Sequence, residues 1–91
     1  MKMTNNKIFS NIDNRTINQI LEELSQKENS SSELVGMFID EHIRVIISIY
    51  RDKSIIIWQP DFKESHKLSD NAIELLCEDE IKHPERYRRI A

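Results

Sequence analysis

The sequence predicts a single small α+β domain, with helices and antiparallel strands in the order α-β-β-β-α. Three observations predict it: helical apolar spacing near both ends, alternating apolar and polar residues at the centre, and only one Gly and two Pro. With 91 residues, of which 38% are hydrophobic and 32% charged, the chain can bury one modest core, and collagen-like or disulfide scaffolds are excluded. We expect a flexible segment over residues 1–9 and one domain over residues 10–91.

The first predicted helix covers residues 11–27. Ser10 and Asp13 resemble a capping box at its start, and Asp13 or Asn14 are alternative N-caps. Polar residues occupy one side of this helix, and apolar residues recur at the i, i+3, i+4, i+7 spacing of a single face. The apolar residues are Ile17, Ile20, Leu21 and Leu24.

Residues 34–39 fit either a strand or a short helix. Leu34, Val35, Phe38 and Ile39 could form a helical stripe. β-Branched and aromatic side chains favour a strand instead, as does Gly36, which weakens a helix by about 1 kcal/mol relative to Ala. We therefore predict the strand and keep the helix as the alternative.

The centre of the chain predicts an antiparallel hairpin. Apolar and polar residues alternate over residues 42–50, and β-branched residues return over residues 55–58. A turn centred on residues 52–53 would pair Tyr50 with Ile55, and cross-strand partners point to the same side of a sheet. This register directs Ile43, Val45, Ile47, Ile49, Ile56 and Trp58 toward the helices. It directs Ile46, Tyr50, Ile55 and Ile57 to the opposite face.

The last main helix is predicted to begin after Ser69, which is a favourable N-cap, and to end at residues 83–84. Pro84 can then begin a short final helical turn over residues 85–90. Residues 62–67 precede it as a charged loop. The expected buried stripe comprises Ala72, Ile73, Leu76, Cys77 and Ile81.

Few chemical functions fit these residues. The histidines and Cys77 lack the paired spacing of metal ligands, and Gly36 alone cannot build a phosphate-binding loop. Cys77 falls on the apolar stripe of the last helix, where a thiol usually acts as a small core residue. We expect no catalytic residue, no metal site and no cofactor.

Two surfaces are predicted to bind protein partners. Asp70, Glu74 and Glu78 recur every four residues along the last helix, which is typical either of a solvated face or of a docking surface for a basic partner. The second surface is the sheet face with Ile46, Tyr50, Ile55 and Ile57, whose apolar area is large for a small sheet to leave in water. Either the two helices take opposite faces of the sheet or a partner covers this one. We expect a partner, and a second copy of the chain would make a homodimer.

A basic segment near the C-terminus indicates the alternative function. Arg and Tyr side chains grip phosphate and stack on bases, so Arg86, Tyr87, Arg88 and Arg89 could contact nucleic acid. The formal net charge of −3 argues mildly against this function. The sequence therefore predicts a non-catalytic interaction module, such as an adaptor, inhibitor, immunity or regulatory protein, with a nucleic-acid-associated regulator as the alternative.

The setting is expected to be cytoplasmic. No apolar run is long enough to cross a membrane, no secretory signal is visible, and one Cys cannot form an internal disulfide. Frequent Ile, Asn and Lys together with scarce Ala and Gly follow AT-rich codons, which suggests a bacterium with an AT-rich genome, its phage or another mobile element.

Overall fold

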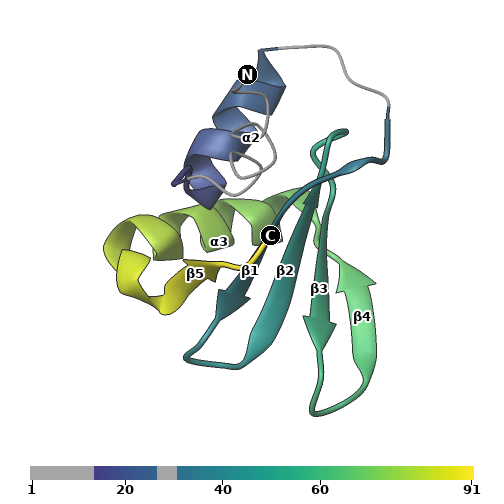
Figure 1. Ribbon diagram of the computed structural model, residues 1–91, viewed down its shortest axis with the longest axis vertical. Coiled ribbons are helices and arrows are strands. Elements are labelled where there is room, and N and C mark those ends of the chain that lie inside the picture. Colours follow the sequence, from purple (N-terminus) through teal and green to yellow (C-terminus); the bar gives the residue numbers. More distant parts are fainter. Residues whose placement is uncertain (1–13, 27–30) are drawn as a thin grey trace, which may run out of the picture.

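The computed structural model describes residues 14–26 and 31–91 as a two-helix, five-stranded α+β fold, which confirms the predicted class (Figure 1). The elements are α2 (Ile17–Ser25), β1 (Leu34–Asp40), β2 (Val45–Tyr50), β3 (Ile55–Gln59), β4 (Glu64–Lys67), α3 (Asp70–Lys82), the 3-10 helix η1 (Pro84–Arg86) and β5 (Tyr87–Arg89). All strand pairs are antiparallel, in the order β4-β3-β2-β1-β5. The segment predicted to be flexible, residues 1–9, lies outside the described residues.

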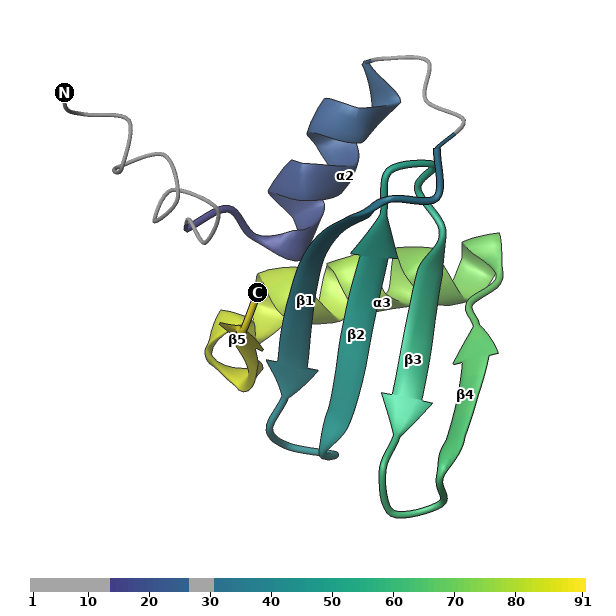
Figure 2. The ribbon, with the colours of Figure 1, turned by 45° about the vertical axis from the view of Figure 1, so that its right-hand side comes forward.

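Helix α3 carries the chain from one edge of the sheet to the other. Its 13 residues span about 20 Å, and the spacings between β4 and β5 sum to about 19 Å. The helix therefore crosses behind the strands and delivers β5 beside β1 (Figure 2). In the described part of the chain, α2 packs on the same side, so both helices cover one face of the sheet and neither covers the other (Figures 1 and 2).

The core lies between the two helices and the covered face. Gly36 on β1 allows a close approach there, because a Cβ at this position would lie 3.2 Å from Cδ1 of Ile20 and 3.3 Å from Nη2 of Arg89. The predicted apolar face of the first helix is confirmed, and residues 34–39 form the predicted strand. The buried apolar residues are Ile17, Ile20, Leu24, Phe38, Val45, Ile47, Ile49, Ile55 and Ile57.

Helix α2 begins later than predicted. Thr16 is its N-cap, and a capping box joins Thr16 to Gln19: the N–H of Gln19 donates to Oγ1 of Thr16 at 3.1 Å, and the N–H of Thr16 donates to Oε1 of Gln19 at 2.8 Å. Asn14 therefore precedes the cap, and the predicted helix over residues 14–16 is wrong. The other predicted caps, Ser10 and Asp13, lie outside the described residues.

A buried carboxylate from α3 completes the N-terminus of α2. The side chain of Glu80, a residue that is only 4% exposed, accepts hydrogen bonds from the backbone N–H of Ile17 at 2.8 Å and of Asn18 at 3.0 Å. The side-chain amide of Asn18 donates to Glu80 at 2.6 Å and to the carbonyl of Cys77 at 3.0 Å. A negative charge at a helix N-terminus also complements the helix dipole. Glu80 thus joins α2 to α3.

Glu80 displaces a predicted core residue. Ile81 was expected in the buried stripe of the last helix but is 70% exposed. Successive helical residues are separated by about 100° around the axis, so Ile81 cannot face inward while its neighbour Glu80 does. Ile73 and Leu76 pack against the core as predicted.

The β2–β3 hairpin differs from the predicted register by one residue. A turn over residues 51–54 was predicted, but the observed turn has three residues, 51–53: Tyr50 donates its N–H to the carbonyl of Ser54 at 2.9 Å, and Lys53 adopts φ 74°. The carboxylate of Asp52 accepts from both the N–H and the hydroxyl of Ser54, which stabilises this turn. Ile49 therefore pairs with Ile55, and the side chains of β3 point opposite to the predicted directions.

Two further strands replace predicted irregular segments. Part of the predicted charged loop over residues 62–67 is β4, which pairs with β3. Residues 85–90 were expected as a short helical turn, but only η1 is helical, and Tyr87–Arg89 form β5 beside β1.

Replacing Glu80 is predicted to destabilise the domain strongly. Glu80→Ala leaves the buried amide donors of Ile17 and Asn18 without an acceptor, so the free energy of unfolding should fall by about 3 kcal/mol. Urea denaturation followed by circular dichroism measures it. The matched control is Glu78→Ala on the exposed side of the same helix, with an expected change below about 0.5 kcal/mol. Equal effects of the two substitutions would contradict the capping role.

Lys53→Gly is predicted to stabilise the protein. Gly relieves the steric cost of the left-handed conformation, and after its own backbone entropy is subtracted we expect a gain of about 0.5 kcal/mol. Lys67→Gly, in β4, is the control and should lower the free energy of unfolding. The same denaturation experiment measures both variants, and a loss of stability from Lys53→Gly would contradict the turn geometry.

Candidate interaction surfaces

Within residues 14–26 and 31–91, neither α2 nor α3 covers one face of the sheet, and this face carries a continuous apolar surface, here called the open sheet face. One cross-strand row runs from Arg88 through Ile39, Ile46 and Trp58 to Ser65, because these residues are direct partners on successive strands. Trp58 is 37% exposed. The apolar and aromatic residues of the open sheet face are Met37, Ile39, Ile46, Tyr50, Ile56 and Trp58.

Cationic side chains lie at the margins of this face. Arg88 on β5 and Lys67 on β4 point to it from the two edges of the sheet. A hollow of about 280 Å³ at one end is lined by Ile39, Ile46 and Pro60, with Arg44 and Glu41 beside them. Glu41 also forms an ion pair with Arg88 at 3.1 Å. The open sheet face therefore combines an apolar centre with a mainly positive border.

The structure places only part of the predicted sheet site on this face. Ile46 and Tyr50 point outward as predicted, whereas Ile55 (0% exposed) and Ile57 (9%) belong to the core, so their predicted exposure is wrong. The physical reason is the three-residue turn, which reverses the two faces of β3. Sequence reasoning missed Met37, Ile39, Ile56 and Trp58 as members of the open sheet face.

The edges of the sheet are poorly suited to pairing with another strand. β4 is short and consists of Glu64, Ser65, His66 and Lys67, all exposed, and charged residues at an edge discourage strand addition. β5 on the opposite edge is three residues long. The face of the sheet, rather than its edges, is the surface available for a partner.

The acidic residues predicted as a docking site lie on the outward side of α3. Asp70, Glu74 and Glu78 are all exposed, as the four-residue spacing predicts. Leu75 (66% exposed) and Ile81 lie on the same outward side. We call these five residues the outward face of α3; it lies on the side of the molecule opposite to the open sheet face (Figure 2).

The basic residues of the C-terminal segment are engaged within the chain. Arg86 lies 3.5 Å from Asp79, and the hydroxyl of Tyr87 donates to the same carboxylate. Arg89 lies over the ring of Phe38, 5.4 Å from its centroid, and donates to the carbonyl of Val35 at 3.3 Å. Arg88, with its side chain 60% exposed, is paired with Glu41. This segment is therefore an integrated edge strand, not an extended tail.

Asp79 and Tyr87 face a cavity of about 410 Å³ between α3 and the sheet. Apolar side chains such as Val45, Ile57 and Leu76 line it, together with His42 and His66. The hydrogen bond from Tyr87, followed by the charges of Arg86, His83 and His42, holds the pKa of Asp79 below its usual value. Burial and the bond to Asp79 raise the pKa of Tyr87 far above the ordinary tyrosine value. This pair locks β5 onto α3.

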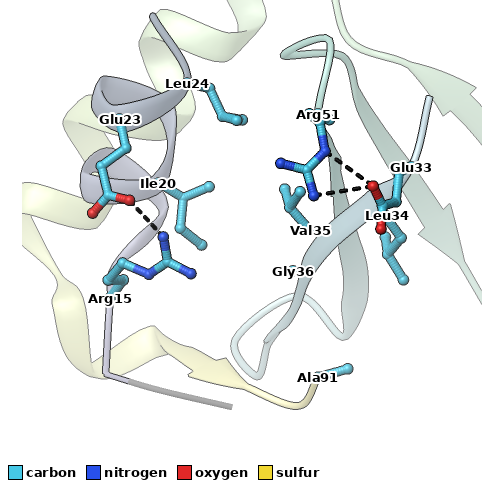
Figure 3. A pocket seen from close by; sticks show the side chains of 10 residues that line it. All are labelled: Arg15, Ile20, Glu23, Leu24, Glu33, Leu34, Val35, Gly36, Arg51 and Ala91. Carbon is cyan, nitrogen blue, oxygen red and sulfur yellow. Dashed lines mark hydrogen bonds and ion pairs between the residues drawn. The ribbon is translucent and has the colours of Figure 1, made fainter. Parts of the chain in front are cut away.

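A second cavity of about 530 Å³ separates α2 from β1 (Figure 3). Ile20 and Leu24 line its α2 side, and Val35 lines the sheet side. Ion pairs lie on either side, between Arg15 and Glu23 at 2.6 Å and between Arg51 and Glu33 at 3.0 Å.

The chemistry of the remaining groups is limited. Burial and the charges of Glu80 and Glu74 raise the pKa of Cys77, so its thiol stays protonated at neutral pH. Within residues 14–26 and 31–91, His, Cys, Asp and Glu side chains nowhere gather in threes that would hold a metal ion. No helix in the described ranges is long and apolar enough to cross a bilayer.

Comparisons of the chain with protein-family models, with curated proteins and with solved structures found no match.

Tyr87→Phe is predicted to raise the pKa of Asp79 toward its ordinary value, because it removes the largest cause of the depression. Carboxyl NMR titration measures the change, and Arg86→Gln is the control with a smaller expected rise.

The same substitution should change how stability depends on pH. A carboxyl group whose pKa is lower in the folded protein than in the unfolded chain, where it is about 3.9, stabilises the fold at higher pH. This contribution is lost as the pH falls through the pKa of the folded state. The stability difference between wild type and Tyr87→Phe should therefore shrink in acid. An unchanged Asp79 pKa in Tyr87→Phe would contradict this assignment.

Proposed function

We propose that this protein is a non-catalytic protein-interaction module whose main binding surface is the open sheet face. The observation that carries the proposal is the row Ile39, Ile46 and Trp58, which crosses the three central strands on the side that, in the part of the chain the structure describes, neither α2 nor α3 covers. Contiguous apolar surface of this kind marks binding sites in proteins. Adaptor, inhibitor, immunity and regulatory proteins all act through such surfaces, and we place this protein in that class.

The composition of the open sheet face supports a protein partner. Trp58 and Tyr50 are aromatic anchors of the type that dominates binding energy at protein interfaces. Burying an aliphatic side chain such as Ile46 contributes about 1.5–3 kcal/mol if it becomes fully enclosed. A partner that encloses this row gains affinity without any chemical step.

The charges of the two exposed surfaces support selective docking. The margin of the open sheet face carries Lys67 and Arg88, whereas the outward face of α3 carries Asp70, Glu74 and Glu78. Electrostatic attraction speeds encounter and selects orientation, while apolar contact supplies affinity. We propose a cytoplasmic setting and self-association as part of this function.

Replacement of the apolar row is predicted to abolish partner binding while the fold survives. Ile46→Thr/Trp58→Thr keeps β-compatible side chains and removes the apolar anchors. In affinity capture from cells that produce the chain, with polypeptides quantified by mass spectrometry, proteins enriched by the wild type should fall at least about tenfold.

The matched control is Ser48→Thr/Ser65→Thr, which places Thr on the same face and leaves the apolar row intact. It should capture the same proteins as the wild type. Circular dichroism establishes that both variants are folded. If the Ile46→Thr/Trp58→Thr variant recovers the wild-type set at the wild-type yield, the open sheet face is not the binding surface and the proposal is wrong.

A further inference from the structure

The open sheet face and the outward face of α3 are complementary to each other. Resting on the proposed role of the open sheet face, we infer that its partner is the outward face of α3 from a second copy of this chain. Copies then associate head to tail. The inference follows from apolar exposure, from charge and from the geometry of the sheet.

The outward face of α3 has apolar groups that the described residues of its own chain do not shelter. Leu75 is 66% exposed and Ile81 is 70% exposed. Residues at three-residue spacing are neighbours on a helix surface, so Glu78 lies between these two aliphatic side chains. Leu75 and Ile81 with Glu78 between them are complementary to a surface that combines apolar area with a cation. The open sheet face has both.

Charge favours pairing of unlike faces over pairing of like faces. The open sheet face has Arg44, Lys67 and Arg88 around its apolar centre, against one carboxylate, Glu41. The exposed side of α3 has Asp70, Glu74 and Glu78 against one cation, Lys82 in its last turn. A two-fold dimer through the sheets would bring the cationic margins of both copies together. A two-fold dimer through the helices would bring carboxylates together. Only the pairing of sheet with helix matches opposite charges.

The dimensions of the sheet also fit. Helix α3 already spans the strands of its own sheet on the covered face (Figure 2). A second α3 laid across the open sheet face has the same width to cross, and the hollow beside Ile39 and Ile46 can receive a protruding Leu75 or Ile81 side chain. Because the two surfaces lie on opposite sides of the molecule, the contact is heterologous and each added copy exposes a new binding face.

The test uses two variants of the full chain, each with one surface disabled. The sheet variant is Ile46→Thr/Trp58→Thr, and the helix variant is Glu74→Lys/Glu78→Lys. Sedimentation velocity is recorded from low micromolar to several hundred micromolar protein. The wild type should show a sedimentation coefficient that rises steadily with concentration, and each variant alone should associate at least about tenfold more weakly. High salt should also weaken the wild-type association.

Mixing the two variants gives the sharpest result. The helix variant retains a working sheet and the sheet variant retains a working helix, so an equimolar mixture should form heterodimers and grow no further. The charge control, Glu22→Lys/Glu64→Lys, makes the same change in net charge at exposed positions on α2 and β4 and should associate like the wild type.

Three results would overturn the inference. They are a wild type that stays monomeric, a mixture that forms no heterodimer, and a wild-type dimer that the sheet variant disrupts and the helix variant does not. The last result would assign the site to sheet-to-sheet pairing. A monomeric wild type would remove self-association from the proposed function. Binding of other proteins by the open sheet face is decided separately, by whether the sheet variant loses captured proteins.

Discussion

The arrangement of the helices depends on one buried carboxylate. Helix α2 has nine residues, which is too short for an isolated helix to be stable in water, so its free N–H groups and its apolar face must both find partners. Glu80 supplies the acceptor for Ile17 and Asn18. Because Glu80 must face inward to do so, the rotation of α3 about its axis is set, and Leu75 and Ile81 are turned to solvent. The capping of one helix thus determines which surface the other presents.

Local patterns in the sequence predicted several elements correctly. The apolar stripe of α2 and the Ser69 cap of α3 each depend on residues within one or two turns, and the structure confirms both. β4 and β5 were missed because residues such as His66 and Arg88 have no apolar alternation. These segments become strands through hydrogen bonds to β3 and β1, which a local pattern does not contain.

The sequence predicted that one face of the sheet is apolar and exposed, but it identified only some of the residues on that face. In Ile55-Ile56-Ile57 every position is apolar, so alternation cannot decide which side chain faces the core. The geometry of the turn decides it. Lys53 adopts φ 74°, and a non-glycine residue gives little sign in the sequence that the turn contains residues 51–53. Glu80 was hidden in the same way, since an acidic residue beside Glu78 and Asp79 reads as part of a solvated cluster.

The late position of β5 in the chain has a consequence for synthesis on the ribosome. β1 through β4 are joined by short turns and can pair as they emerge, because their contacts are close in sequence. The outer edge of β1 must wait until α3 and then Tyr87–Arg89 have been translated. Until then, the outer edge of β1 at Phe38 has no partner strand. A truncated or stalled product would keep this edge unpaired, and an unpaired edge can pair with strands of other chains.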